Sequence, residues 1–459
     1  MLTVSTPVAD FVEGYARRDP LRLHMPGHKG KGETERLDIT EVTGAPALYP
    51  ASGILRESEE RAAELFGTGR TVYSAEGSSL CIRAMLFLAR LQGLEAGRTP
   101  VILAGRNAHR SFLSAAALMD LEIRWLMGDS LLSCLPTPVQ VAEALDGPKD
   151  LPAAVYLTSP DYLGFRADVS GIARICHDRG VPLLVDNAHG AYLRFLPRDE
   201  HPLSLGADLV CDSAHKTLPV LTGGAYLHIH RKAPALFARE AERGMALFAS
   251  TSPSWLILQS LDRANGLLAS NFPAALADFL PLATCCRDRI RAMGYQVMDT
   301  EPLKITLAPK CYGYTGEQLH EALQERGIEA EFADPDFLVL MPAPVTGAAG
   351  LDRLEAALKD ISRRDPIMTS PPPLPRGRRR LSPREAQFSA AETLPLARCV
   401  GRVLADPCVS CPPAVPILIC GEEIDEDALR CFRYYGREEL ACVRESGFGE
   451  SENGAGRGE

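Results

Sequence analysis

The sequence predicts an α/β fold built on a mostly parallel, doubly wound sheet. Between residues 55 and 230, short apolar segments alternate with longer amphipathic segments. Strands that read as continuous Val, Leu, Ile and Ala runs are typical of a sheet buried on both faces. Their alternation with helices of about 10–15 residues favours parallel strands joined by crossover helices.

The individual elements follow from periodicity and from their ends. Apolar residues spaced by three and four positions predict helices, and short continuous apolar runs predict strands. Gly147 and Gly180 end two of the helices, and Pro160 ends a strand. The expected order is helix 55–67, helix 77–93, strand 100–105, helix 109–119, strand 122–127, helix 138–147, strand 153–160, helix 169–180, and strands 181–190, 207–213 and 224–229.

The second half of the chain predicts smaller units. Residues 253–295 are expected to be helical throughout, and a smaller α/β pattern follows them. A proline-rich, basic stretch then predicts an extended linker. The expected domains are an N-terminal arm (1–54), a large domain (55–265), a small α/β domain (266–365), the linker (366–383), a C-terminal domain (384–445) and a disordered tail (446–459).

Composition excludes some function classes. The 459 residues carry a formal net charge of -10, which argues against nucleic acid or an anionic membrane as partner. We find neither a signal-peptide pattern nor an apolar run of about 18 residues, so we expect a cytoplasmic location and no membrane span. The 13 cysteines are expected to be mostly reduced, and the lone Cys408–Cys411 pair lacks the partners of a metal site.

Polar side chains stand where four predicted strands end. Because parallel strands bring their carboxyl ends to one edge of a sheet, and ligands bind there, these residues predict a site. They are Asn107 and His109, Thr158 and Ser159, Asp186 and His189, and Ser213, His215 and Lys216.

Asp186 and Lys216 point to pyridoxal phosphate chemistry. A carboxylate after a Val/Leu strand needs a cationic partner, which a protonated pyridine nitrogen would provide. A lysine amine at the neighbouring strand end can bind the cofactor aldehyde as a Schiff base. The alternatives are a turn or N-cap role for Asp186 and a surface position for Lys216. Thr158, at the same edge, is expected to contact the cofactor.

The start of helix 77–93 predicts a phosphate cup. Gly77, Ser78 and Ser79 open this helix, where free backbone amides and hydroxyls can bind an anion. Simple N-capping by either serine is the alternative. Ser213 and His215 could add further phosphate contacts.

Several ordered motifs together resemble the ornithine/lysine/arginine decarboxylases of pyridoxal-phosphate fold type I, in their shorter bacterial form. The similarity covers nearly the whole chain. The motifs are "LHMPGHKGKG" (23–32), "LDITEVTG" (37–44), "RNAHRSF" (106–112), "VDNAHGAYLRF" (185–195), "SAHKTLPVLTGGAYLH" (213–228), "TSPSWLILQSLDRA" (251–264) and "CPPAVPILICGEEI" (411–424).

The resemblance implies an aminotransferase-like fold and a set of roles. Lys216 would hold the cofactor aldehyde, Asp186 the pyridine nitrogen, His109 would stack on the ring, and His189 would lie near its phenolate side. Gly77, Ser78, Ser79, Ser213 and His215 would surround the phosphate. The substrate would be a basic amino acid, and Lys216 or His109 would return a proton to Cα. Family members form dimers or larger assemblies, so a homo-oligomer is expected.

Departures from the family pattern leave other functions open. The phosphate cup here begins with Glu76, whose charge would repel a phosphate unless it pointed away. A different fold type I enzyme (an aminotransferase or aldolase-type lyase) would share the Asp–Lys pair, and a degenerate homologue would bind cofactor without turnover. Glu422 and Glu423 are candidates for a cation-binding pocket, with a solvated acidic loop as the alternative.

Overall fold

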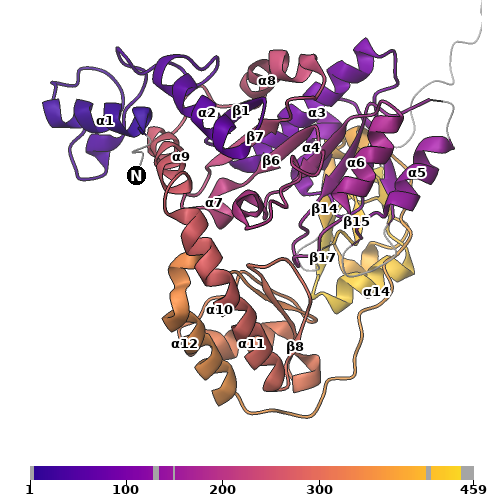
Figure 1. The fold of residues 1–459 in the computed structure, drawn as a ribbon. Helices are drawn as coiled ribbons and strands as arrows, with labels where there is room; N and C mark the ends of the chain where they lie inside the picture. The colour runs from indigo at the N-terminus through magenta and orange to yellow at the C-terminus, as the bar shows by residue number, and fades with distance from the viewer. Residues whose placement is uncertain (1–4, 128–133, 148–149, 410–414, 446–459) are drawn as a thin grey trace, which may run out of the picture.

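The structure is a computed structural model that describes residues 5–127, 134–147, 150–409 and 415–445. Figure 1 shows its ribbon. A seven-stranded sheet and a separate four-stranded sheet account for most strands, and three two-stranded sheets include the C-terminal elements. The tail expected over 446–459, and Cys411 of the Cys-x-x-Cys pair, lie outside the described residues.

The large sheet confirms the predicted α/β fold. Only β7 runs against its neighbours in this sheet; the other described strands share one direction. The sheet is therefore mostly parallel. In spatial order its strands are β1 (Arg70–Ser74), β7 (Ala225–Ile229), β6 (Leu209–Asp212), β5 (Leu183–Asp186), β4 (Ala154–Thr158), β2 (Val101–Gly105) and β3 (Glu122–Leu126).

Helices cover both faces of this sheet. α3 (Gly77–Glu95), α4 (Arg110–Leu118) and α8 (Ala235–Phe248) cover one face, and α5 (Pro138–Asp146) and α6 (Val169–Asp178) cover the other. Alternate residues of β5 enter the two cores, so Leu184 packs with the first set and Leu183 and Val185 with the second. This alternation explains why the strands are apolar throughout.

The N-terminal arm packs through a buried carboxylate. In α1 (Pro7–Arg18), the amides of Val8 and Ala9 each donate to an oxygen of Asp262 at 2.9 Å. Asp262 belongs to α9 (Trp255–Leu268), and α2 (Gly53–Phe66) lies beside both. Figure 1 shows α1 and the chain that follows it projecting from the body of the molecule.

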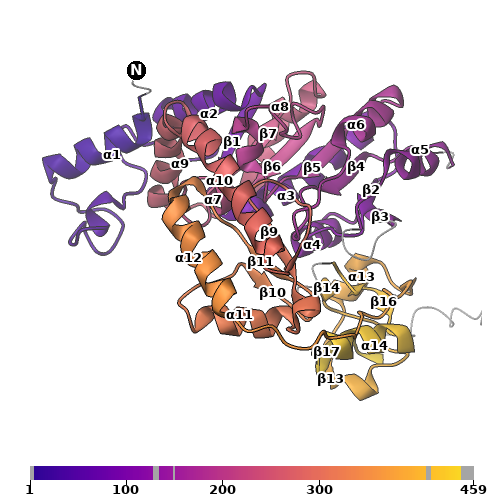
Figure 2. The same cartoon turned by 60° about the horizontal axis from the view of Figure 1, so that its bottom comes forward.

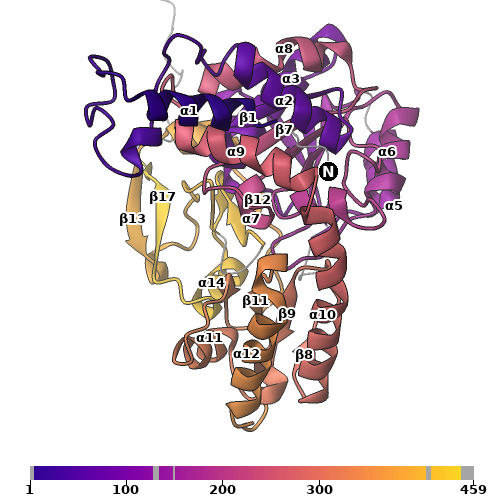
Figure 3. The same cartoon turned by 60° about the vertical axis from the view of Figure 1, so that its left-hand side comes forward.

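The small sheet is antiparallel. Its strand order is β10 (Phe332–Ala333), β11 (Leu338–Leu340), β9 (Ile305–Ala308) and β8 (Gln296–Val297). α10 (Phe272–Ala292) and α12 (Gly347–Asp360) lie along it in Figure 3, and α11 (Gly316–Gln324) packs against β10 and β11.

The segment 253–295, expected to be helical throughout, contains two helices with a break between them. α9 ends at Leu268, and α10 leaves at an angle of 76° from it. Within the described residues no single helix has the length and apolar character to cross a membrane; this bent pair has them only when its two helices are taken together. Trp255, Leu258 and Leu261 of α9 are buried in the protein core.

The C-terminal elements form a compact unit beside the large sheet (Figure 2). Its two-stranded sheets pair β12 with β16, β13 with β17, and β14 with β15. The bounds are β12 (Arg378–Arg379), α13 (Pro383–Phe388), β13 (Ala391–Pro395), β14 (Cys408–Val409), β15 (Leu418–Ile419), β16 (Glu422–Glu423), α14 (Glu426–Tyr434) and β17 (Glu439–Val443).

Several described elements were not anticipated from the sequence, among them α1, α8 and β1. α1 and α8 lie in segments that carried no helix prediction, and β1 is a short strand between two helices. β1 depends on long-range pairing, because its partner β7 lies about 150 residues later in the chain. The domain boundaries expected from composition remain predictions.

A buried ion pair joins the C-terminal unit to the large sheet. The guanidinium of Arg106, just after β2, donates to both oxygens of Glu422 at 2.9 and 2.7 Å. The two side chains are only 4% and 6% exposed, and Arg106 also lies 5.3 Å from the centre of the Trp125 ring. Two parallel hydrogen bonds give this contact a defined geometry.

We expect Glu422→Gln to lower the free energy of unfolding by about 3–5 kcal/mol, because Arg106 would keep a buried charge without its partner. Urea denaturation followed by circular dichroism measures the change. Glu423→Gln is the matched control, since its partners Arg378 and Arg380 are exposed, and it should change the free energy by less than about 1 kcal/mol. Equal losses in the two variants would contradict the importance of the pair.

Candidate active site

Four strand ends meet around one cavity of about 110 Å³. Thr158 of β4 lies opposite Asp186 of β5, and Asp186 lies opposite Cys211 of β6. Seven of the residues predicted from the sequence line this cavity, which places them together as expected. Its lining consists of Ser78, Asn107, Ala108, His109, Thr158, Asp161, Tyr162, Asp186, Ala188, His189, Lys216 and Pro416.

Asp186 is fixed at the base of the cavity and is 2% exposed. The Tyr156 hydroxyl donates to its Oδ2 at 3.2 Å, and the Ala188 amide donates to its Oδ1 at 3.1 Å. These bonds orient the carboxylate but leave it without a cationic partner among its hydrogen-bond donors. A cationic ring nitrogen in the cavity would complete its environment.

Lys216 and His189 are hydrogen-bonded to each other. Lys216 lies in the short helix α7 (Ala214–Thr217), and its Nζ is 2.9 Å from Nε2 of His189. Burial lowers the pKa of His189 well below 6.5, and the nearby Lys304 and Lys216 lower it further. His189 is therefore the neutral acceptor and Lys216 the donor, which leaves the imidazole proton on Nδ1.

Tyr162 closes the cavity above Lys216. Its ring centre lies 6.0 Å from Nζ of Lys216 and 5.0 Å from the ring centre of His189. Its hydroxyl donates to Oε1 of Glu331 at 2.9 Å. Tyr162 was not predicted as a site residue, although it belongs to the "DYLGF" turn that follows β4.

His109 caps α4 and also lines the cavity. Its Nδ1 accepts the Ser111 amide at 3.2 Å, so the neutral ring carries its proton on Nε2. Burial lowers the pKa of His109, Asp186 opposes this shift, and Lys216 adds to it. The residue thus has both an N-cap role, the structural alternative, and a position where it could stack on a ring.

The first turn of α3 forms the predicted cup. Gly77 has a φ of +71°, which only glycine adopts readily, and its amide donates to Gly223 O at 2.7 Å. The hydroxyl of Ser213 donates to Ser78 at 2.7 Å, and that of Ser111 donates to Ser79 at 2.8 Å. Four hydroxyls therefore gather at the start of a 19-residue helix.

Glu76 does not oppose an anion in this cup. Its Oε1 accepts the amide of Ser250 at 2.7 Å, so the carboxylate is held at the loop after α8. His215 is turned toward Gly224, whose carbonyl oxygen lies 3.0 Å from Nδ1. The amides and hydroxyls at the start of α3, together with Ser213, are the groups arranged for an anion.

The donor set fits pyridoxal phosphate. Four residues that line the cavity each have a buried polar atom with no hydrogen-bond partner among the described residues: Asn107 (Oδ1), Thr158 (Oγ1), Asp161 (Oδ2) and His189 (Nδ1). Buried polar atoms are rarely left unpaired, so their gathering at one cavity indicates a polar ligand. A lysine amine, a carboxylate and an anion cup surround it, as the cofactor's three polar groups require.

The acidic residues expected near the C-terminal motif do not line the cavity. Both oxygens of Glu422 bind Arg106, and Glu423 pairs with Arg380 at 3.1 Å. The C-terminal unit instead contributes Pro416 to the lining. A sequence motif gives no indication of which distant arginine will bind a glutamate.

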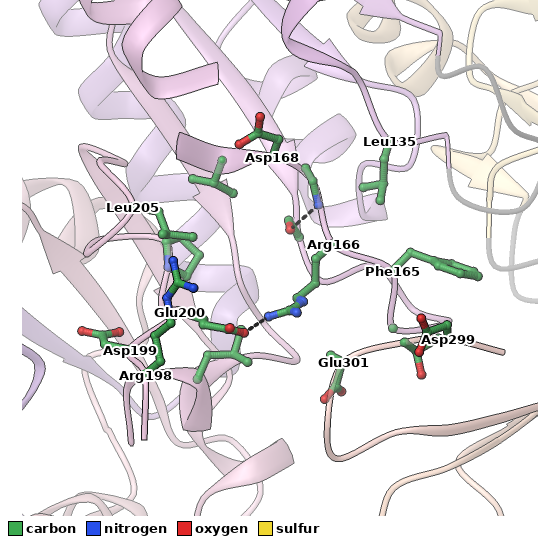
Figure 4. Close-up of a pocket in the computed structure, with 17 residues that line it drawn as sticks. Leu135, Phe165, Arg166, Asp168, Arg198, Asp199, Glu200, Leu205, Asp299 and Glu301 are labelled. Atoms are coloured by element: carbon green, nitrogen blue, oxygen red, sulfur yellow. Dashed lines mark hydrogen bonds and ion pairs between the residues drawn. The ribbon is translucent and has the colours of Figure 1, made fainter. Parts of the chain in front are cut away.

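A larger cavity of about 730 Å³ is lined in part by residues of the segment Ser159–Val169 (Figure 4). Arg166 and Glu200 form an ion pair within it, and Asp168, Asp199, Asp299 and Glu301 add further carboxylates. Ser159 and Gly164 face this second cavity, whereas Asp161 and Tyr162 line the first. The segment therefore contributes residues to both cavities.

Beneath the site, His201, Asp212 and His228 form a fully buried cluster whose ligand atoms lie within 4.8 Å of one another. The Leu203 amide donates to Nδ1 of His201, which places that ring's proton on Nε2, 2.9 Å from Oδ2 of Asp212. Although burial raises the pKa of Asp212, the two histidines lower it below its usual range. This donor assignment explains the contact between His201 and Asp212 by a hydrogen bond.

Comparisons with known proteins agree with the geometry. Residues 6–350 match the family profile "Orn/Lys/Arg decarboxylase, major domain". An arginine decarboxylase of Halalkalibacterium halodurans is 30% identical, over 95% of this chain and 94% of its own, and one of Bacillus anthracis is 29% identical, over 93% and 92%. A crystal structure of a Francisella novicida lysine decarboxylase superimposes with a TM-score of 0.77, at 15% identity, covering 96% of this chain and 81% of its own.

The depressed pKa of His189 predicts how stability depends on pH. As pH falls through about 6.5, the unfolded chain takes up a proton at this position and the folded chain does not, so the free energy of unfolding falls. We expect His189→Gln to remove up to about 1.4 kcal/mol per pH unit of this dependence below pH 6.5.

Urea denaturation of both proteins from pH 5 to 8 measures the difference. Between pH 7 and 8 the imidazole is neutral in both states, so the two curves should run parallel there and serve as the internal control. If the free energies of unfolding of the two proteins also ran parallel below pH 6.5, His189 would be shown to take up a proton in the folded protein.

Proposed function

Because the chain belongs to the Orn/Lys/Arg decarboxylase family, we propose that it removes carbon dioxide from a basic amino acid with pyridoxal 5′-phosphate as cofactor. Arginine is the first candidate, since the two relatives of about 30% identity are arginine decarboxylases, and lysine and ornithine follow. The observation that carries this proposal is the meeting of Lys216, His189 and Asp186 in one cavity at the ends of parallel strands.

Each polar group of the cofactor has a matching residue. Lys216 would hold the aldehyde, Asp186 the protonated ring nitrogen, and the start of α3 with Ser213 the phosphate. His109 would stack on the ring, and Thr158 and His189 would offer their unpaired atoms to it. When bound, pyridoxal phosphate supplies the electron-accepting ring that takes up the electron pair left by carbon dioxide.

Lys216 is placed to handle the proton that replaces the carboxylate. Its Nζ donates to Nε2 of His189, a neutral acceptor that keeps the amine positioned in the cavity. An ammonium held in this way can deliver a proton to Cα, whereas His109 offers Nε2–H from the opposite strand end. His189 then acts by orienting the lysine.

Tyr162 and Pro416 restrict access of water. The tyrosine ring lies over Lys216, and Pro416 enters the lining from the C-terminal unit. Exclusion of water strengthens the electrostatic interactions between Asp186 and a ring cation. A small enclosed cavity also disfavours release of a reactive carbon centre to solvent.

Two alternatives from the sequence are less well supported. An aminotransferase or aldolase-type lyase would share Asp186 and Lys216, but the family match and the relatives' names favour decarboxylation. A non-catalytic homologue was suggested by Glu76, whose carboxylate is held by Ser250 away from the cup. Assembly into a homo-oligomer and a cytoplasmic location remain predictions.

The proposal predicts that the purified protein with pyridoxal phosphate releases carbon dioxide and the corresponding amine from one of arginine, lysine and ornithine. Lys216→Ala should abolish the visible absorbance band of the lysine-bound cofactor and lower turnover by about 10²–10⁴-fold, as loss of a positioned proton donor does. Absorbance spectra, evolved carbon dioxide and amine analysis measure these outcomes.

Lys232→Ala is the matched control, because Lys232 is an exposed lysine outside the cavity, and it should leave band and turnover unchanged. A Lys216-dependent band with no carbon dioxide from any of the three amino acids would contradict the proposal. Formation of a keto acid in place of the amine would favour the aminotransferase.

A further inference from the structure

The cavity holds a carboxylate that the cofactor does not require. Among the described residues that line it, the carboxylates are those of Asp161 and Asp186. Asp186 is the partner for a ring nitrogen, which leaves Asp161 without a role. A basic amino acid brings a second cation into the cavity, and burying that cation unpaired would be unfavourable.

Asp161 is buried with one oxygen bound and the other unpaired. It is 4% exposed, and its Oδ1 accepts the amides of Gly164 and Phe165, each at 2.8 Å. Its Oδ2 has no hydrogen-bond partner among the described residues. Burial raises the pKa of this carboxyl to about 7, while the backbone hydrogen bonds and the charge of Lys304 oppose the shift.

The backbone that carries Asp161 is held rigidly. Nζ of the fully buried Lys304 donates to the carbonyl oxygens of Asp161 and Tyr162 at 3.1 and 2.9 Å. This lysine approaches Asp161 through its main chain, so it leaves Oδ2 available. A positioned carboxylate on a fixed turn binds a cation with little loss of side-chain entropy.

Other acidic residues nearby are bound to partners or lie outside this cavity. Glu422 binds Arg106 through both oxygens, and Glu331 is exposed and accepts the hydroxyl of Tyr162. Glu301 is buried, and the Leu303 amide donates to its Oε2 at 2.9 Å. Its Oε1 has no hydrogen-bond partner among the described residues, but Glu301 lines the larger cavity and not this one. Asp161 is therefore the carboxylate in this protomer best placed to meet a cation inside the cavity.

We propose that Oδ2 of Asp161 binds the cationic end of the substrate side chain and so selects basic amino acids. The inference rests on the proposed function, because it names the group that recognises that substrate class. The competing explanation is that Asp161 only stabilises the turn through its two backbone hydrogen bonds.

Asp334 offers a matched control for this explanation. It is also buried, at 1% exposure, and its Oδ1 accepts the amides of Asp336 and Phe337 at 2.7 and 2.6 Å. Burial raises its pKa to about 7 as well. It lies in the turn between β10 and β11 and does not line the cavity.

The test compares Asp161→Asn and Asp334→Asn with the parent protein, each loaded with pyridoxal phosphate. Asparagine keeps the Oδ1 acceptor of the turn and removes the charge. Binding of 1,4-diaminobutane, 1,5-diaminopentane and agmatine is followed by the shift of the absorbance band, with butylamine and pentylamine as analogues that lack the distal cation. KM and kcat are measured for the amino acid that is decarboxylated and for its uncharged counterpart, norleucine or citrulline.

We expect Asp161→Asn to weaken binding of the diamines or agmatine, and to raise KM for the basic amino acid, by at least about 30-fold. Butylamine, pentylamine and the uncharged amino acid should change less than about 3-fold, and Asp334→Asn should behave as the parent protein does. These ratios follow from loss of a buried, charge-assisted hydrogen bond.

Unchanged diamine binding in Asp161→Asn, with the absorbance band intact, would overturn the inference and leave Asp161 a turn residue. A parent protein that binds diamines no better than the monoamines would overturn it too. Both of these outcomes are measured by amine binding and do not depend on carbon dioxide release. A protein that decarboxylates none of the three amino acids would therefore refute the proposed function, while amine binding would still test this inference. Thermal unfolding of both variants shows whether each remains folded.

Discussion

The backbone ladder of β4, β5 and β6 places Thr158 opposite Asp186, and Asp186 opposite Cys211. The candidate groups depend on that register. A slip of one residue would point the Asp186 side chain toward a face of the sheet that helices cover, and would bring an apolar neighbour to the edge. Helices on both faces bury the ladder and hold the register. The site thus lies at one edge of the hydrophobic core, where apolar strands end in polar residues.

Electrostatics around the cavity follows from the same burial. His189 is kept neutral between Lys216 and Lys304, and Asp161 is left with an uncompensated oxygen. Burial also lowers the pKa of Lys304 to about 8. Such groups are unfavourable in a resting protein and become favourable when a charged ligand arrives, which is why perturbed pKa values gather at functional sites.

The cavity also depends on Pro416, which lies 200 residues beyond Lys216 in the chain. Pro416 reaches the lining because the C-terminal unit is fixed to the end of β2 by the Arg106–Glu422 pair. Arg106 and Asn107 are consecutive, so the residue that binds the C-terminal unit stands next to one that lines the site. The geometry couples docking of this unit to completion of the cavity.

The sequence by itself determined the fold class and the main chemistry, because both follow from local patterns. Apolar runs ending in Asp186, His189 and Lys216 indicate a parallel sheet with a polar edge, and the register of the strands brings those ends together. Ser78 and Ser79 were equally visible at a helix start.

Only the tertiary structure decided which charges are paired and which are not. Glu422 looked available in the sequence and is bound by Arg106, whereas Asp161 looked like a turn residue and retains an unpaired oxygen at the cavity. β1 likewise depends on a distant segment, because it pairs with β7. Burial and long-range partners set the energy of a charged group, and neither can be read from its neighbours in the chain.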